Sequence, residues 1–370
     1  MSTFDALPTV RFAAGAMRII DQTLLPRRHE VVALSRLAPV CEAIRALRVR
    51  GAPAIGVAAA YGLLVAVEEA FAGGGPVFES GVDDAGNVAP SRVARTPSAS
   101  LPDLHAVLAR ASDEIGSTRP TAVNLAWALE RMRGRWESDA DTPTALLAAL
   151  VAEADAILAE DLAMGRAMTA HGEALLDDGD AVLTHCNTGG LATGGVGTAL
   201  GVVFAAHAGG KRVHVFADET RPLLQGGRLT AWECARRGVP VTVLVDGAAA
   251  SLLASKRVRA VLVGADRIAA NGDTANKIGT LGVAIHAARF GVPFYVVAPS
   301  STIDSSLPTG ASIPIEQRAA HEVLGVGGVE ISAAGSVYNP AFDVTPAELV
   351  TAIITEQGIH RAPYRFAAHP

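Results

Sequence analysis

Residues 180–208 read DAVLTHCNTGGLATGGVGTALGVVFAAHA, and this stretch decides the fold expected for the second half of the chain. An apolar run typical of a strand leads into a glycine-rich loop, which leads into a stretch typical of a helix. In open α/β sheets, this junction between strand and helix is where ligands bind and chemistry takes place. Cys186 lies at the junction.

Four more β-rich runs follow, namely RVHVFADE, PVTVLVD, AVLVGAD and PFYVVAP, and each interval between them is long enough for a helix. This alternation predicts an α/β domain over residues 171–370, with a parallel sheet and crossover helices. The ends of parallel strands lie along one edge of the sheet, so side chains there could face a single cleft. The strand ends carry Cys186, Asp218, Asp246, Asp266 and Ser300.

The first half of the chain has a different period. From about residue 30 to 175, apolar residues recur every three or four positions, which predicts a mainly helical N-terminal domain over residues 1–170. Residues 73–100 contain few apolar residues and many turn formers, which predicts a flexible surface insertion. The longest apolar run, residues 54–67, is shorter than a membrane span and is followed by two glutamates. It is therefore predicted to be a buried helix and not a membrane segment.

The composition excludes several classes of protein. With 370 residues, half of them hydrophobic, the chain can form two domains with large cores. A net charge of −6 argues against nucleic-acid binding. Three cysteines without a CxxC pair argue against a disulfide framework and fit a reducing cytoplasm. Ten histidines without HExxH or a Cys/His cluster predict no metal site.

Two interpretations of Cys186 remain open from its position alone. Free cysteine is most often a small buried apolar residue, whereas a helix N-terminus just beyond it would favour a thiolate. Neighbouring residues of a strand point to opposite faces, so a dyad with His185 is not expected if the strand continues through both.

The glycine-rich loop also has two interpretations. It matches no P-loop, and Gly195-Val196-Gly197 lacks the third glycine of a dinucleotide fingerprint. Asp218 does stand where a ribose-binding acid would lie, which keeps a nucleotide-dependent oxidoreductase as an alternative. Glycines that allow close packing are the simpler explanation.

Other candidates pair a charged residue with the end of a strand or helix. Asp266 ends an apolar strand, where burial would keep its carboxyl protonated and suited to general acid catalysis, although a loop cap is an equal possibility. Asn276 and Lys277 are predicted to open the following helix and to form an anion site with its free amides. Arg50 and Arg119 each precede a predicted helix, an arrangement that suggests phosphate binding.

The motifs taken together resemble one family. The stretches RGAPAIGVAAAYG, RPTAVN, THCNTGGLATGG, ADETRPLLQGGRLTAWE, GADRIAANGDTANKIGT, IPIEQR and NPAFDVTP occur in the order typical of methylthioribose-1-phosphate isomerases. The resemblance runs from about residue 21 to 358, apart from residues 73–100, and Gly227 stands where alanine is expected. It implies a helical N-terminal domain and a Rossmann-like, doubly wound C-terminal domain, the fold of the regulatory subunits of translation initiation factor 2B.

The resemblance also implies a function. The family converts 5-methylthio-D-ribose 1-phosphate to 5-methylthio-D-ribulose 1-phosphate in methionine salvage, as cytoplasmic homodimers without a cofactor. Asp266 would be the proton donor, and Cys186 would assist at the transition state. Substrate-binding positions of the family fall on Arg50, Gly51, Ala52, Arg119, Gln225, Asn276 and Lys277.

Two alternatives stay open beside this function. A related isomerase acting on 5-deoxyribose 1-phosphate or ribose 1,5-bisphosphate would use the same catalytic pair. A non-catalytic regulatory subunit is the alternative from another class, and retention of both Cys186 and Asp266 argues against it.

Overall fold

The computed structural model describes residues 6–71, 73–79, 90–138, 140–333 and 335–366. The chain forms two compact units. The first contains Ala6–Ala163 together with the short segment Leu191–Gly195, and the second contains Met164–Gly190 and the chain from Val196 onward. The sequence pattern gave no indication that Leu191–Gly195 would pack with the first unit.

The first unit begins with a small antiparallel sheet that the sequence analysis did not predict. Its strands are β1 (Val10–Ala13), β2 (Ala16–Ile20) and β3 (Val31–Leu34), paired in that order. The tight turn between β1 and β2 places Ala14 and Gly15 at φ of 52° and 72°, as a two-residue hairpin requires. These strands are only four or five residues long, too short for a period-two pattern to distinguish them from the helical region that follows.

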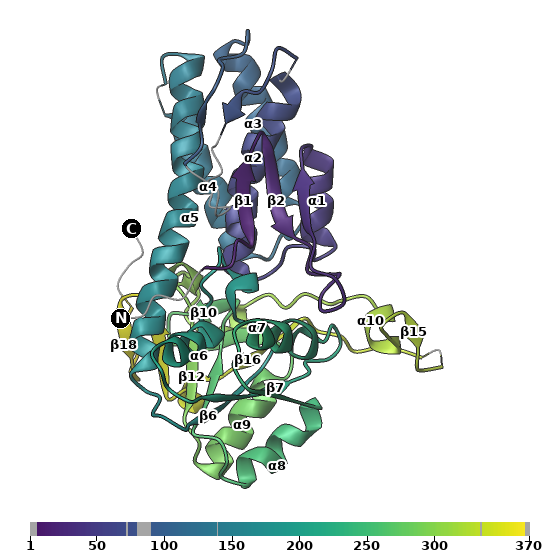
Figure 1. The fold of residues 1–370 in the computed structure, drawn as a ribbon, viewed down its shortest axis with the longest axis vertical. Coiled ribbons are helices and arrows are strands. Elements are labelled where there is room, and N and C mark those ends of the chain that lie inside the picture. The colour runs from purple at the N-terminus through teal and green to yellow at the C-terminus, as the bar shows by residue number, and fades with distance from the viewer. Residues whose placement is uncertain (1–5, 72, 80–89, 139, 334, 367–370) are drawn as a thin grey trace. The chain divides into compact units, whose positions relative to one another are not determined.

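The helices of the first unit were predicted, and Figure 1 shows them in purple to teal. They are α1 (Leu37–Arg45), α2 (Ala52–Phe71), α3 (Leu101–Gly116), α4 (Val123–Glu137) and α5 (Pro143–Glu173), the last of which continues into the second unit. Among the described residues, α2 alone is long and apolar enough to cross a membrane, and 83% of its most apolar stretch is buried in the protein. It is the buried core helix that the sequence predicted.

Most described residues of the segment 73–100 are exposed, but a few at its ends are buried in the first unit. Strand β4 (Phe78–Glu79) pairs with β5 (Arg92–Val93), and the side chains of Val77 and Phe78 are fully buried. The carboxylate of Glu68 on α2 accepts hydrogen bonds from the amides of Val77 and Phe78. Two apolar residues and one buried acid therefore hold this flank in the core, and the prediction for residues 80–89 lies outside the described residues.

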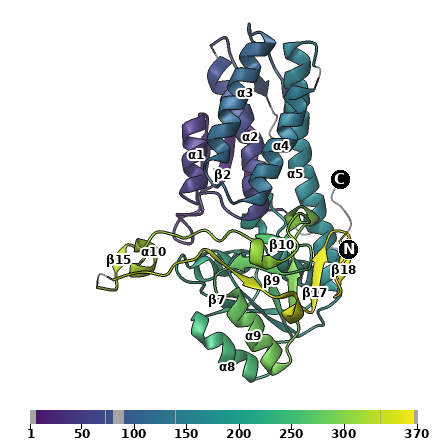
Figure 2. The same cartoon turned by 180° about the vertical axis from the view of Figure 1, so that it is seen from behind.

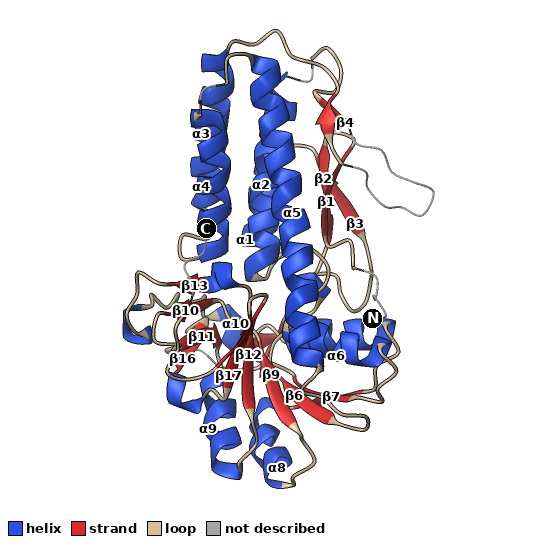
Figure 3. Cartoon of the chain, turned by 90° about the vertical axis from the view of Figure 1, so that its left-hand side faces the viewer, coloured by secondary structure: helices blue, strands red, loops and turns tan. Residues whose placement is uncertain are grey.

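The second unit contains a seven-stranded sheet with the order β18-β17-β12-β9-β6-β7-β8, in which only β18 is antiparallel to its neighbour (Figures 2 and 3). The five predicted strands are present. The bounds are β6 (Ala181–Thr184), β7 (His214–Asp218), β8 (Val241–Leu244), β9 (Ala260–Val263), β12 (Phe294–Val297), β17 (Ala352–Thr355) and β18 (Gly358–His360).

Helices cover both faces of this sheet, which makes it doubly wound. One core contains residues of α6 (Ala199–Ala208) and α7 (Ala231–Arg236), and the other contains residues of α8 (Ala249–Ala254) and α9 (Thr280–Phe290). Successive residues of β6 alternate between them, with Val182 in the first core and Leu183 in the second. The strand order reverses between β6 and β9, the position where sheets of this kind bind ligands.

A second, four-stranded sheet follows β9 and was not predicted. Its order is β13 (Ile303–Asp304), β10 (Arg267–Ala269), β11 (Thr274–Lys277) and β16 (Phe342–Thr345). Asn276 and Lys277 are therefore the last residues of a strand, and the helix predicted to start with them begins at Thr280. Beyond this sheet, α10 (His321–Leu324) and the hairpin of β14 (Gly325–Val326) and β15 (Val329–Glu330) extend away from the large sheet (Figures 1 and 2).

Candidate active site

Cys186 lies just beyond the end of β6, in a strained backbone conformation. The strand ends at Thr184, and Cys186 has φ of 65°, a value that residues other than glycine rarely adopt. Its amide donates to Thr220 Oγ1 at 2.8 Å, and its carbonyl accepts from the hydroxyl of Thr230 at 2.7 Å. The side chain is buried. Two hydroxyls thus hold the backbone of Cys186 in a conformation that a continuing strand would not allow.

His185 forms no dyad with Cys186, as expected, because both nitrogens of its ring contact other groups. Its Nδ1 lies 2.9 Å from Asp218 Oδ2, and its Nε2 lies 2.8 Å from the carbonyl oxygen of Ile278. Asp218 is fully buried, so it does not present a carboxylate to a ribose. This contact removes the main support for a nucleotide-dependent oxidoreductase.

The protonation of this pair follows from its surroundings. Burial lowers the pKa of His185, but the hydrogen bond and charge of Asp218 outweigh burial and raise the pKa overall. Burial raises the pKa of Asp218, and the hydrogen bond from His185 offsets part of that rise. Both directions mean that the pair retains a proton that a separate imidazole and carboxylate would lose near neutral pH.

Asp266 follows β9, the strand next to β6. Gly264 lies in the chain between the end of β9 and Asp266, and a Cβ there would come within 2.8 Å of the Thr188 methyl group. The exit of β9 therefore packs closely against the loop that carries Cys186. Asp266 is half-buried, and its amide donates to the carbonyl of Ala275 at 2.9 Å. The structure thus brings the segments of Cys186 and Asp266 to adjacent strand ends at the reversal point of the sheet.

Asn276 and Lys277 are placed by β11, and their surroundings correct the prediction of free helix amides. Asn276 Nδ2 donates to Thr280 Oγ1 at 3.0 Å, and Lys277 Nζ donates to the carbonyl of Ala341 at 2.8 Å. The amides at the start of α9 are already used, since Gly279 and Leu281 donate to the carboxylate of Asp343 at 2.7 and 3.0 Å. An anion here would meet side chains of β11 and not the helix start. Asp343 belongs to the NPAFDVTP motif, and this motif was the only sign in the sequence that a carboxylate would bind the amides at the start of α9.

Gln225 is the site residue that physical reasoning from sequence did not single out. It precedes a short π-helical turn, Gly226–Thr230, a feature often found at functional sites. Its Oε1 is buried without a hydrogen-bond partner among the described residues. A buried amide oxygen left in this state is a ready acceptor for a ligand hydroxyl.

Arg221, by contrast, fixes the backbone of the arm formed by α10 and the β14–β15 hairpin. Its guanidinium donates to the carbonyls of Val323 and Gly325. Arg221 therefore fixes the arm to the segment that follows β7.

In the first unit, Arg50, Gly51 and Ala52 lie at the start of α2. Gly51 has φ of 98°, and a Cβ there would approach the Ala192 carbonyl oxygen to 2.4 Å, so only glycine fits. Arg50 is buried, and its Nε donates to Gln22 Oε1 at 2.9 Å. The position is rigid and keeps a cation beside the amino end of a helix.

Arg119 has the same relation to α4. It lies four residues before Val123, where the helix begins without a side-chain cap. The starts of α2 and α4 are adjacent, since a Cβ on Gly56 would lie 2.9 Å from the carbonyl oxygen of Asn124. Two arginines therefore precede two neighbouring helix starts in one unit, an arrangement suited to a phosphate.

The glycines of the glycine-rich loop allow close packing against neighbouring side chains, which is the simpler of the two interpretations above. The amide of Gly190 donates to the buried carboxylate of Glu233 at 2.8 Å, and that of Gly194 donates to Asp161 at 2.6 Å. A Cβ on Gly189 would lie only 2.4 Å from an oxygen of Glu233. Because side chains of the protein already accept from these amides, the loop is not arranged as a cradle for nucleotide phosphates.

A cluster of one histidine and two aspartates lies beside the site. His185, Asp218 and Asp246 lie close enough to hold a cation, with ligand atoms within 4.8 Å of one another. Hydrogen bonds already use both nitrogens of His185, one oxygen of Asp218 and both oxygens of Asp246, which accept from the amides of Thr220 and Arg221. The trio is a hydrogen-bonded network that holds the segment after β7.

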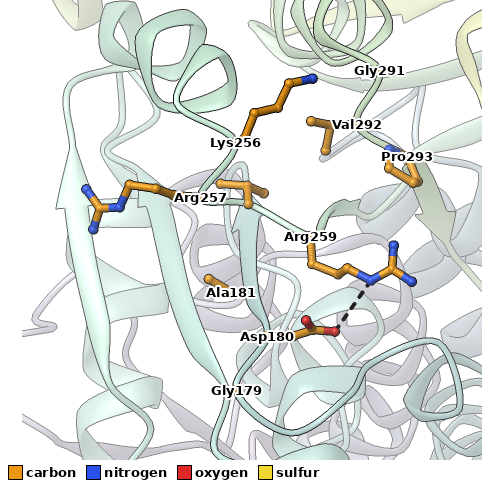
Figure 4. A pocket seen from close by; sticks show the side chains of 10 residues that line it. Gly179, Asp180, Ala181, Lys256, Arg257, Arg259, Gly291, Val292 and Pro293 are labelled. Atoms are coloured by element: carbon orange, nitrogen blue, oxygen red, sulfur yellow. Dashed lines mark ion pairs between the residues drawn. The ribbon is translucent and has the colours of Figure 1, made fainter.

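A pocket of about 360 Å³ opens at the opposite edge of the sheet, before β6 and β9 (Figure 4). Its cations are already paired within the chain. Arg259 forms an ion pair with Asp180 at 3.7 Å, Lys256 donates to the carbonyl of Phe290, and Arg257 lies over the Phe216 ring. None of the predicted site residues lines this pocket.

Comparison with known proteins links this geometry to a family. Residues 48–362 match the model of the initiation factor 2 subunit family. The chain is 48% identical over 369 residues to the methylthioribose-1-phosphate isomerase of Albidiferax ferrireducens, covering 97% of this chain and 95% of the relative. The structure of 5-methylthioribose 1-phosphate isomerase from Pyrococcus horikoshii OT3 is 40% identical, with a TM-score of 0.84 over 96% of this chain and 93% of that chain.

A second solved structure is similar to nearly the same degree. The delta subunit of translation initiation factor eIF-2B from A. fulgidus is 39% identical, with a TM-score of 0.81 over 97% of each chain. The fold alone therefore does not separate a catalytic chain from a regulatory one, and the site must do so.

Proposed function

Because this chain belongs to the methylthioribose-1-phosphate isomerases of the initiation factor 2 subunit family, we propose that it converts 5-methylthio-D-ribose 1-phosphate to 5-methylthio-D-ribulose 1-phosphate in methionine salvage. The observation that carries this proposal is the pair of Cys186 and Asp266 on adjacent strand ends. A purely regulatory chain has no need of an acid and a thiol at the reversal point of its sheet.

The chemistry of the substrate explains why this pair is needed. Phosphate on C1 locks the sugar as a ring, so an acid must protonate the ring oxygen before the ring can open. Asp266 is proposed as that acid. A hydrogen must then move from C2 to C1, either as a proton through an enediol-like species or as a hydride. Cys186 is proposed to act at the reacting carbons, as the base or by stabilising charge.

The remaining residues are proposed to bind the substrate. Arg50 and Arg119, with the amides at Gly51 and Ala52, suit the phosphate because they combine guanidinium groups with helix starts. From the second unit, Gln225, Asn276 and Lys277 are proposed to contact the sugar and its phosphate. Gln225 has an unpaired acceptor to offer, and Lys277 a cation that is half-buried.

We also propose that the protein works as a cytoplasmic homodimer. The arm carries an exposed apolar side chain at Val329, and the segment that follows it carries two more, Ile331 and Tyr338, the last of which is 84% exposed. Such residues are more stable when a second copy covers them. Sedimentation equilibrium across a range of concentrations would give twice the chain mass, and a monomer at every concentration contradicts this part of the proposal.

An activity panel tests the function directly. The protein would be given the α-1-phosphates of 5-methylthioribose, 5-deoxyribose and ribose 5-phosphate, with ketose formation followed by NMR. We expect turnover of the methylthio sugar with the highest kcat/KM, and none by a matched Asp266→Asn preparation. Preference for another sugar would assign the related isomerase activity, and absence of turnover with all three would support the regulatory alternative.

A further inference from the structure

We propose that His185 is a positioning residue for the isomerase reaction, held as an imidazolium by Asp218, which ties the loop of Cys186 to the segment that follows Lys277. The proposal rests on the proposed function for its kinetic part only. His185 touches neither substrate nor reacting atoms in this role, and acts through its neighbours in the chain.

The first step is the bridge itself. His185 directly precedes Cys186 at the exit of β6, and its Nε2 lies 2.8 Å from the carbonyl oxygen of Ile278, which directly follows Lys277. The ring also packs against the next residue, since a Cβ on Gly279 would lie 2.7 Å from Cε1 of the ring. One side chain therefore joins the backbone beside the proposed catalytic cysteine to the backbone beside the proposed binding lysine.

The second step concerns the proton. A carbonyl oxygen only accepts, so Nε2 must carry a hydrogen. The 2.9 Å contact between Nδ1 and Asp218 Oδ2 needs another hydrogen between the two atoms. If that hydrogen is on Nδ1, the ring is an imidazolium; if it is on the oxygen, Asp218 is a neutral acid. In both cases the pair holds one proton more than a neutral ring beside a carboxylate.

The surroundings favour the imidazolium. Asp246 on the turn after β8 and Asp343 on β16 add negative charge that acts on the ring, besides Asp218 itself. Asp218 is completely buried, and its Oδ1 has no hydrogen-bond partner among the described residues. A carboxylate in that state needs an adjacent cation, because burying a single charge without a counter-ion is strongly unfavourable.

The third step is the consequence for catalysis. Both ends of the bridge are fixed independently: Cys186 by Thr220 and Thr230, and the segment after Lys277 by Asp343. His185 sets the spacing between these two anchored segments. Misplacing reacting groups by about 1 Å can cost on the order of 10²-fold in rate, so loss of the bridge should lower kcat more than it raises KM.

Two variants separate the bridge from its charge. His185→Gln removes the ring and should lower kcat by about 10²-fold with a smaller change in KM. Asp218→Asn keeps the volume and can still donate to a neutral ring, so it removes the imidazolium but not the contact. It should lower kcat by about tenfold and make kcat/KM depend on pH near the ordinary histidine pKa of about 6.5. His214→Gln, at the far end of β7, is the matched control and should match the wild type.

A spectroscopic readout decides the charge without any substrate. In ¹⁵N-labelled protein at pH 8, one histidine should show both ring nitrogens protonated, and its signals should disappear in His185→Gln and change in Asp218→Asn. A single protonated nitrogen on His185 at pH 8 overturns the imidazolium. Wild-type kcat in folded His185→Gln, or in Asp218→Asn if the first variant does not fold, overturns the positioning role. If the wild type turns over no sugar, the proposed function fails while the NMR result still stands.

Discussion

The two compact units use the amides at their helix starts in opposite ways. In the second unit, the amides at the glycine-rich loop and at the start of α9 donate to the carboxylates of buried Glu233 and half-buried Asp343. In the first unit, α2 and α4 have no acidic residue in the first turn and begin just after Arg50 and Arg119. The second unit therefore uses its polar groups to fix the backbone around Cys186 and Asp266, whereas the first unit leaves positive helix ends for an anion. Phosphate binding is therefore expected to depend chiefly on Arg50 and Arg119, and the chemistry on Cys186 and Asp266.

The largest expected effect comes from the acid in the second unit. Asp266→Asn should keep the fold and most of the substrate affinity, but it should lower turnover by about 10³–10⁴-fold, within the range of general acid–base contributions. Steady-state kinetics would give kcat and KM, with Asp304→Asn as a control carboxylate from the small sheet that begins just after Asp266. Turnover within tenfold of the wild type would remove Asp266 from its role and weaken the division between the units.

Cys186→Ser tests the other half of the catalytic pair. The hydroxyl is much harder to ionise than the thiol, so turnover should fall by about 10²–10³-fold while the melting temperature changes little. If the cysteine only fills space, a hydroxyl in its apolar slot should instead lower stability by about 1–3 kcal/mol and leave turnover intact.

Alkylation provides an independent check on Cys186. Burial raises the pKa of Cys41 to about 11 and that of Cys234 to about 12, so these thiols should react slowly. Iodoacetamide should therefore inactivate the enzyme through Cys186, and saturating substrate should protect it. Full activity of a protein alkylated at Cys186 contradicts a role at the reacting carbons.

The binding residues allow a direct comparison of the two units. Arg50→Ala should raise KM by roughly 10–150-fold, since a charge-assisted hydrogen bond contributes about 1.5–3 kcal/mol. Lys277→Ala should raise KM by less, because Lys277 also donates to the carbonyl of Ala341 within its own unit. Arg48→Ala, three residues beyond the end of α1, serves as the control, because the Arg48 side chain is paired with Asp21 and Glu42.

Inhibition by inorganic phosphate locates the anion site. It should weaken in Arg50→Ala and remain nearly unchanged in Arg48→Ala. If phosphate inhibits Arg50→Ala as well as it inhibits the wild type, the anion is bound elsewhere and the assignment of phosphate binding to the first unit is wrong.

The sequence predicted the long helices because their period is sustained over many residues. It predicted the five parallel strands because each is an apolar, β-rich run separated from the next by an interval long enough for a helix, and the doubly wound arrangement followed from the family resemblance. It missed the short strands β1–β3 and the sheet that contains β10, β11 and β16, where three to five residues are too few to show a period. That is why Lys277 was placed at a helix start. Strand order was also beyond the sequence pattern, and only the order places β6, which leads to Cys186, next to β9, which leads to Asp266.

The contacts of the candidate site were less predictable than its residues. Position at strand ends and before helices indicated Cys186, Asp266, Arg50 and Arg119, whereas Gln225 came from the family resemblance alone. The bridge of His185 depends on a carbonyl 93 residues away in the chain. No local pattern encodes such a contact, because any buried residue can supply a carbonyl oxygen.

The smallest expected effect concerns the loop Leu191–Gly195, the part of the second half that packs with the first unit. Asp161 on α5 is buried, and its carboxylate accepts from the amide of Gly194 at 2.6 Å. Burial raises the pKa of Asp161 to about 6, although the hydrogen bond from Gly194 and the charge of Arg11 oppose the rise. The first unit therefore holds this loop through an acid that ionises close to neutral pH.

The sign of the pH effect follows from that raised pKa. The unfolded chain loses this proton near pH 4, while the folded chain keeps it until about pH 6, so the free energy of unfolding should fall as pH rises through this window. The difference between the pKa of Asp161 in the folded and unfolded chain changes the free energy of unfolding by roughly 3 kcal/mol at most. Asp161→Asn keeps an oxygen to accept from Gly194 and has no proton to lose, so its urea midpoint should equal that of the wild type near pH 4 and exceed it at pH 7.5. Asp178→Asn is the control of opposite sign, because the pKa of exposed Asp178 is lowered to about 2 by Arg212. Equal pH slopes for the wild type and Asp161→Asn would show that the loop is held independently of the charge on Asp161.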